Sequence, residues 1–204
     1  TIPANALSNA KGVISVTIPS TVKNIGDYAF FNCTSLKSIT LHEGLNTIGS
    51  RAFYSCTSLR FINIPDGLIT IGDYAFYSCT SLQSVTLPEG LTSIGSATFS
   101  GCNALQSINL PEGITSIKQE VFSKCSALET LTLPSSVTSI DYGAFDKCTS
   151  LTSIILPNGL KSIGNFAFSS CVSLESIALP DGLKTIGEKA FSSCLSLESA
   201  TIPE

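Results

Sequence analysis

The stretch CTSLQSVTLPEGLTSIGSATF, residues 79–99, belongs to a unit that recurs along the chain every 23 residues. A cysteine opens each copy, and a phenylalanine precedes each cysteine by three residues. The cysteines are Cys33, Cys56, Cys79, Cys102, Cys125, Cys148, Cys171 and Cys194. One fixed period is typical of a solenoid, in which each repeat buries its apolar side chains against its neighbours. The sequence therefore predicts a single elongated domain, residues 1–204, of about nine repeats.

Two segments of the unit have the pattern of strands. Leu82-x-x-Val85-x-Leu87 matches the strand of a leucine-rich repeat, and its inward residues alternate with Ser84 and Thr86. A turn follows at residues 88–90, and residues 91–94 form a second extended piece. We expect a β-dominated solenoid of the α/β type, a leucine-rich repeat arc. Its parallel sheet would be concave, with short extended segments and a helical turn at residues 97–99 on the convex side.

The ends of the chain fall partway through a repeat. Ile2 and Ala10 occupy the slots of Ile25 and Cys33, and the chain stops at Glu204 inside another copy. Because natural solenoids need polar caps, we expect this chain to be a fragment of a longer protein, with a partial repeat at each end.

Composition excludes some classes of function. Hydrophobic residues make up 43% of the chain and charged residues 13%, with a net charge of −4. An acidic chain is a poor partner for nucleic acid. No apolar run approaches the roughly 18–20 residues that span a bilayer, so we expect no membrane insertion by this segment. The start of the chain also lacks the pattern of a signal peptide.

The motif C-x-S-L-x-S-I-x-L-P-x-G-L-x-x-I-G-x-x-A-F resembles the BspA-like class of leucine-rich repeats, first associated with treponemal surface proteins. The resemblance covers essentially the whole chain. Departures occur at His42, Lys118, Ser136 and Asp141, where the motif has proline or glycine. The resemblance implies an extracellular or cell-surface protein. It also implies adhesion, with a host matrix or cell-surface protein as ligand.

The cysteines all occupy one slot, which predicts eight free thiols buried in the core. Stacked copies would bring neighbouring cysteines to about 4.8 Å, but their parallel Cα–Cβ bonds are poorly oriented for a disulfide. The clustered spacings of zinc sites are absent from the sequence. Free cysteine packs as a small hydrophobic residue.

No residue predicts catalysis, a metal or a cofactor. His42 is the single histidine, and its turn slot indicates a solvent-exposed substitution. Successive turns carry a column of carboxylates, namely Glu43, Asp66, Glu89 and Glu112. Calcium binding by this column is a remote alternative, since calcium prefers oxygen ligands. Since Asp and Glu are ordinary turn residues, we interpret the column as structural.

Large side chains in the outward slots of the strands mark a candidate binding face. Phe61 stands where other repeats have Ser or Thr, and Arg60 precedes it. The flanking column runs from Lys37 to Glu198 and passes from basic to acidic, which would orient a partner. Aromatic and arginine side chains are enriched at interface hot spots, so we hypothesise that Arg60 and Phe61 anchor a protein ligand. The predicted ligand-binding residues are Lys37, Arg60, Phe61, Asn63, Gln83, Gln106 and Asn109.

A second aromatic group gathers before the cysteine in the early repeats. Its members are Tyr28, Phe31, Tyr54, Tyr74 and Tyr77. Neighbouring copies of one slot could form an exposed patch for a glycan or a protein, or could cover an edge of the core.

The leading interpretation is therefore a non-enzymatic, adhesin-like module that binds a protein, with a glycan as a further ligand class. One alternative is a passive spacer in a cell-surface stalk. A remote alternative is ice binding by the rows of Ser and Thr. The open ends of the stack also allow end-to-end self-association.

Overall fold

Two short strands in each repeat build a solenoid of parallel strands, in a computed structural model that describes residues 1–201. One row contains β1 (Ser15–Thr17), β3 (Ser38–Thr40), β5 (Phe61–Asn63), β7 (Ser84–Thr86), β9 (Ser107–Ile108), β11 (Thr130–Thr132), β13 (Ser153–Ile155), β15 (Ser176–Ala178) and β17 (Ser199–Thr201). The second row contains β2 (Asn24–Ile25), β4 (Thr47–Ile48), β6 (Thr70–Ile71), β8 (Ser93–Ile94), β10 (Ser116–Ile117), β12 (Ser139–Ile140), β14 (Ser162–Ile163) and β16 (Thr185–Ile186). The last residues of the predicted C-terminal partial repeat, 202–204, lie outside the described residues.

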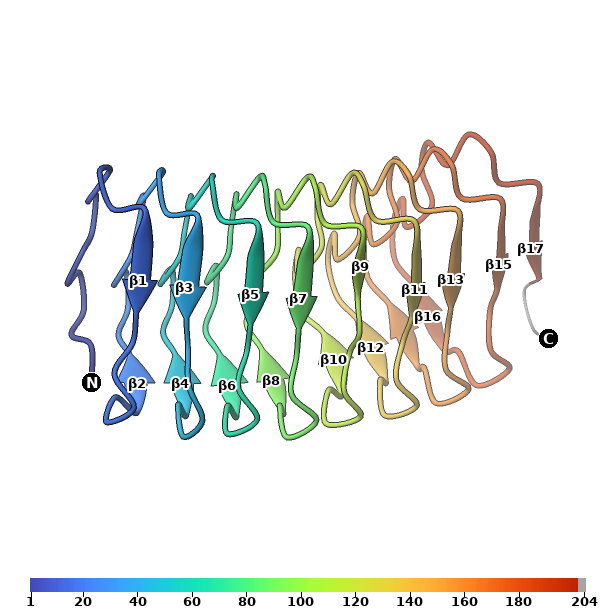
Figure 1. The fold of residues 1–204 in the computed structure, drawn as a ribbon. Helices are drawn as coiled ribbons and strands as arrows, with labels where there is room; N and C mark the ends of the chain where they lie inside the picture. The colour runs from blue at the N-terminus through green and yellow to red at the C-terminus, as the bar shows by residue number, and fades with distance from the viewer. Residues whose placement is uncertain (202–204) are drawn as a thin grey trace.

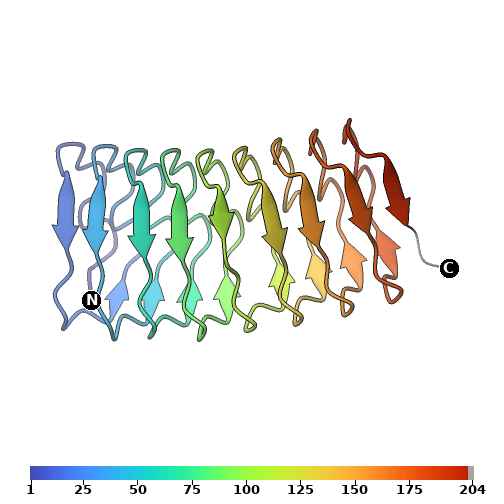
Figure 2. The same ribbon diagram turned by 45° about the vertical axis from the view of Figure 1, so that its right-hand side comes forward.

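The two rows run along the molecule on different sides, with the termini at opposite ends (Figure 1). The odd-numbered and even-numbered strands point in opposite directions, so each coil descends through one row and returns through the other (Figure 2). Every pairing is parallel and joins residues one period apart, such as Val85 with Ile108 and Ile71 with Ile94. The predicted parallel solenoid is confirmed, and its predicted sheet is the row of odd-numbered strands.

The core consists of ladders that continue from coil to coil. Phenylalanine rings from Phe30 to Phe191 stack nearly parallel, with 5.1–5.8 Å between the centroids of neighbouring rings. Leucine and isoleucine side chains of both rows pack against them and are buried. Because this core is shared between coils, no single repeat holds a core of its own.

The segment between the even-numbered strand and the cysteine, which we call the corner, does not form the predicted helical turn. The described residues contain no helix. In the coil of residues 72–79, Tyr74 and Ser78 have left-handed backbones, with φ of 58° and 55°. Alternate amides bond within the coil and to the next coil: Tyr77 donates to the Tyr74 carbonyl, and Phe76 donates to the Thr98 carbonyl. The corner therefore forms its own hydrogen-bonded ladder, which a helical turn would forfeit.

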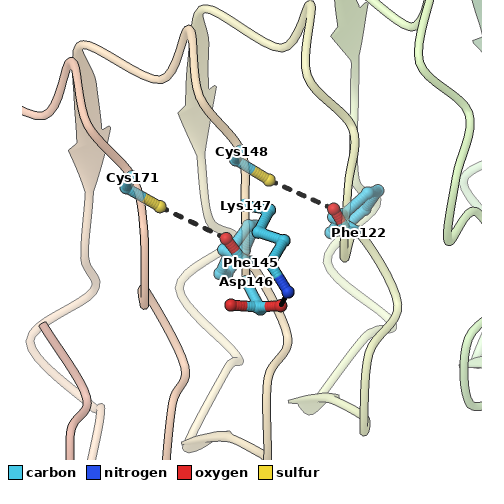
Figure 3. A network of polar contacts seen from close by, with 6 residues as sticks. All are labelled: Phe122, Phe145, Asp146, Lys147, Cys148 and Cys171. Atoms are coloured by element: carbon cyan, nitrogen blue, oxygen red, sulfur yellow. Dashed lines mark hydrogen bonds and ion pairs between the residues drawn. The ribbon is translucent and has the colours of Figure 1, made fainter. Parts of the chain in front are cut away.

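The prediction of buried cysteines is confirmed for seven of them, and Cys194 is half-buried. Each Sγ donates to a carbonyl of the preceding coil at 3.0–3.2 Å. Figure 3 shows Cys148 bonded to the Phe122 carbonyl and Cys171 bonded to the Phe145 carbonyl. The cysteines thus satisfy buried carbonyls of the corner as well as filling space.

Both rows of strands lose their pairing at one common place, which we call the seam. The first row is also unpaired between β3 and β5 and between β13 and β15. The pairing in the second row stops between β8 and β10, and in the first row between β9 and β11. Lys118 lies at this place, in a slot that holds glycine in the earlier coils. A Cβ on Gly72, in the same slot, would lie 2.5 Å from the Ser50 nitrogen. The break in the second row thus coincides with Lys118, whereas Asp141, which also has a Cβ in this slot, keeps its bond to the Ile117 carbonyl at 2.8 Å.

Candidate functional site

The predicted ligand-binding residues lie on one exposed surface, the strand face, which is the solvent side of the odd-numbered strands. Phe61 and Asn63 are on β5, and the Phe61 side chain is 57% exposed. The backbones of Arg60, Gln83 and Gln106 are joined in consecutive coils by hydrogen bonds of 2.9 and 3.3 Å. All seven predicted residues are exposed: Lys37, Arg60, Phe61, Asn63, Gln83, Gln106 and Asn109. The structure therefore brings them to one face.

Two further apolar side chains lie on this face and were not among the predicted ligand-binding residues. Ile14 is 57% exposed, and Ile155 on β13 is 64% exposed. An apolar residue in an outward slot was the available signal for both. With Phe61 and Asn63, Ile155 also interrupts the rows of hydroxyl groups that an ice-binding surface would need.

The predicted aromatic group forms a stacked cluster at the corner. Phe31 and Tyr54 stack at 5.0 Å, and Tyr54 and Tyr77 stack at 4.7 Å, between ring centroids. These rings are half-buried. Burial of Tyr54, together with the neighbouring Tyr77, raises the pKa of the Tyr54 hydroxyl.

Arg51 belongs to this cluster, although the sequence did not single it out. Its guanidinium lies 5.5 Å from the ring centroid of Tyr28 and 4.6 Å from that of Tyr74. Its Nη1 also donates to the Tyr28 hydroxyl at 2.9 Å. The three residues share one slot in consecutive coils, which was the signal in the sequence. A cation between two tyrosine faces is a favourable arrangement.

A hollow of about 400 Å³ lies along this cluster. It is lined by Tyr28, Phe31, Arg51, Tyr54, Tyr74, Tyr77 and Glu120. The corner therefore presents a concave aromatic surface, whereas the strand face presents isolated large side chains among Ser and Thr.

The prediction that His42 is a solvent-exposed turn residue is wrong for its ring. Its side chain is half-buried, and Nδ1 lies 2.7 Å from the Glu43 carbonyl oxygen. Within residues 1–201, Nε2 is buried without a hydrogen-bond partner. The corresponding slot holds the buried Pro65 and Pro88 in the next coils, and the histidine ring follows the same path into the structure.

The turn carboxylates include one with a clear structural role. Glu112 accepts hydrogen bonds from the Ser135 hydroxyl at 2.8 Å and from the amides of Ser135 and Ser136. These bonds, led by the one from the Ser135 hydroxyl, lower the pKa of Glu112. In residues 1–201, no three His, Cys, Asp or Glu side chains come close enough together to hold a metal ion. The same residues include no apolar helix of the length that a bilayer requires.

The model of the BspA type leucine rich repeat region matches residues 1–129 and 115–204, in six copies. The chain belongs to the BspA-type leucine-rich repeat family. The resemblance seen in the motif is thereby confirmed, and the departures at His42 and Lys118 leave the fold of the family intact.

Solved structures of similar proteins come from several bacteria. A leucine-rich repeat protein from Bacteroides ovatus is 30% identical with a TM-score of 0.86, over 98% of this chain and 58% of that one. The leucine-rich repeat protein of T. pallidum is 32% identical with a TM-score of 0.74, over 79% and 78% of the two chains. One from Eubacterium ventriosum is 29% identical with a TM-score of 0.67, over 96% and 45%. This chain thus spans little more than half of the Bacteroides ovatus protein. Comparison with the curated proteins gives no match.

Proposed function

We propose that this chain is a non-enzymatic protein-binding module, displayed on a cell surface and adhesin-like in its role. Membership of the BspA-type family supports this proposal, since the family resemblance implies surface proteins that attach to host matrix or cell-surface proteins. The rigid stack also holds the strand face in one shape, which lowers the ordering cost of binding.

One observation carries the proposal: Phe61 is 57% exposed beside the exposed Arg60, on a face of mostly small hydroxyl side chains. The partners of Phe61 in register are Ser84 and, one coil further, Ser107. Packing inside the solenoid therefore does not account for a phenylalanine at this slot. An aromatic side chain flanked by arginine is the composition of a binding hot spot.

The test is binding to an immobilised panel of matrix proteins and glycans at physiological salt. The variants are Phe61→Ser and Arg60→Gln, which install the residues that neighbouring coils hold in those slots, with Ser84→Ala as the matched control. We expect each variant to lose about tenfold or more in affinity, the range of hot-spot residues, and the control to bind as the parent does. Binding that survives both substitutions would refute the strand-face site. If the parent chain binds nothing on the panel, the result would favour the alternative function, a passive spacer in a cell-surface stalk.

A further inference from the structure

In each coil, the corner has a first residue with a left-handed backbone. The side chains of these equivalent residues form a column along the molecule, and at two positions a small residue leaves a gap in it. In chain order the column holds Asn5, Tyr28, Arg51, Tyr74, Ala97, Glu120, Gly143, Phe166 and Lys189. Ala97 and Gly143 are the small members, and both are buried. Each is flanked by an aromatic residue on one side and by Glu120 on the other.

Both gaps lie under hollows that share Glu120. The hollow of about 400 Å³ is lined by the tyrosine cluster, Arg51 and Glu120, and Ala97 belongs to the coil between Tyr74 and Glu120 without lining the hollow itself. A second hollow, of about 310 Å³, reaches from Glu120 to Phe166 and includes Gly143, Tyr142 and Asp146. A Cβ on Gly143 would lie 3.4 Å from the Glu120 Cγ, which places the Glu120 side chain at the entrance to this hollow. We call the two hollows together the corner groove.

The column itself shows what fits next to its rings. The Arg51 guanidinium lies one coil from Tyr74, 4.6 Å from the ring centroid. The Lys189 Nζ lies one coil from Phe166, 5.5 Å from that ring. On the other side of each ring the next slot holds Ala97 or Gly143. A cation entering either hollow would meet an aromatic ring on one side and the Glu120 carboxylate on the other, both of which stabilise positive charge.

The other charged groups near the two hollows do not reverse the preference of the hollows for a cation. Asp146 and Lys147 both line the second hollow and are paired with each other, with 3.3 Å between Oδ2 and Nζ (Figure 3), so Glu120 is the carboxylate of this hollow that has no ion pair within residues 1–201. The Lys147 side chain is 56% exposed, so solvent screens its charge. Arg51 lies two coils from Ala97, roughly 10 Å away at the spacing of parallel strands, and Tyr74 stands between them.

We propose that the corner groove binds an extended peptide segment with two basic side chains three residues apart, one in each hollow. The hollows over Ala97 and Gly143 are two coils apart, which is roughly 10 Å. In a polyproline II segment, side chains at positions i and i+3 point the same way and are about 9 Å apart. In a strand, positions i and i+2 are about 7 Å apart, which is too short. The groove is separate from the strand face, so this proposal and the one on Phe61 stand or fall independently.

The probe is a synthetic proline-rich peptide with two lysines three residues apart, titrated by fluorescence anisotropy. One control peptide has the same composition with adjacent lysines, and another has glutamine in place of both lysines. We expect the first peptide to bind about tenfold or more tightly than either control, because the glutamine peptide loses both charge-assisted contacts and the peptide with adjacent lysines can make only one of them.

Three variants locate the binding. Glu120→Gln removes the shared carboxylate, and we expect about tenfold weaker binding. Ala97→Arg places the chain's own cation in the first hollow, at a backbone angle that Arg51 already adopts in the same slot (φ of 52° and 54°), and should abolish binding. Glu129→Gln removes the same charge from the strand face and should change nothing. Thermal unfolding confirms that each variant is folded. The proposal is overturned if the peptide does not bind the parent chain, if adjacent lysines bind equally, or if Glu129→Gln weakens binding as much as Glu120→Gln.

Discussion

The corner and the two rows of strands behave differently at the seam. Neither row is paired across it, between β8 and β10 or between β9 and β11. The corner ladder crosses without a break: Ala97 donates to the Gln119 carbonyl at 2.8 Å, and Phe99 donates to the Val121 carbonyl at 3.0 Å. The Phe99 and Phe122 rings also remain stacked, with 5.8 Å between centroids. The two halves of the solenoid are therefore held together at the seam mainly by the corner and the shared core.

The two regions differ in how their backbones accept a change of residue type. In the second row the break coincides with Lys118 in the glycine slot, although Asp141 in the same slot keeps its pairing. In the corner, Glu120 and Lys124 occupy slots with left-handed backbones, and their amides still donate to the Tyr142 and Asp146 carbonyls of the next coil at 3.0 and 2.7 Å. The corner thus tolerates variation in its outward side chains, which is where both the aromatic cluster and the corner groove have arisen.

The largest expected effect is a loss of folding stability at high pH, because the thiols beside the corner are buried. Burial raises the pKa of Cys79, Cys102, Cys125 and Cys148 well above the ordinary 9.0, and the neighbouring thiol in the ladder adds to the shift. Above pH 9 the unfolded chain releases these protons while the folded chain keeps them. The free energy of unfolding should therefore be flat near pH 7–8 and fall above pH 9, by about 1.4 kcal/mol per pH unit for each thiol.

Urea unfolding at a series of pH values measures this slope. The control is Cys102→Ala, which should make the slope shallower by about 1.4 kcal/mol per pH unit. A free energy of unfolding that does not change between pH 9 and 10.5 would contradict the burial of the thiols.

The next effect concerns the phenylalanine ladder at the seam. Phe99 is fully buried and stacks between Phe76 and Phe122. Phe99→Ala should cost about 3–5 kcal/mol, because it leaves a cavity where the rows of strands give no support. Phe61→Ala on the strand face should stay within about 0.5 kcal/mol. Urea unfolding measures both, and a loss below about 1 kcal/mol for Phe99→Ala would show that the corner does not hold the halves together.

The smallest effect is local and concerns the amide of Lys118. The Gly95 amide donates to the Ile71 carbonyl at 2.8 Å, and the Asp141 amide donates to the Ile117 carbonyl at 2.8 Å. Among the described residues, the Lys118 amide makes no such bond to Ile94. Hydrogen exchange should therefore be about tenfold or more faster at Lys118 than at Gly95 or Asp141.

The variant Lys118→Gly tests the cause. Glycine should let the coils close and slow exchange at residue 118, while stability changes by no more than about 1 kcal/mol, because the entropic cost of glycine offsets the new bond. Equal exchange at residue 118 in parent and variant would mean that the Cβ is not what opens the seam.

The candidate sites could be predicted from the sequence to different degrees. The exposure of Arg60 and Phe61 was predictable, because alternation along a strand shows which side chains point outward. The clustering of Tyr54 and Tyr77 was predictable from their shared slot. The inclusion of Arg51 and the two hollows around Glu120 were not, since they depend on how closely two neighbouring columns run along the corner.

By itself, the sequence determined the period, the two strands of each coil and the core ladders, because side chains one period apart must stack in a solenoid. It also determined the shared environment of the cysteines, since they all occupy one slot. Only the tertiary structure decided the path of the corner. Residues as different as Tyr74 and Ser78 adopt left-handed backbones there, and their residue types carry no sign of it. That path replaces the expected helical turn with a hydrogen-bonded ladder, and it brings a carboxylate between two aromatic walls.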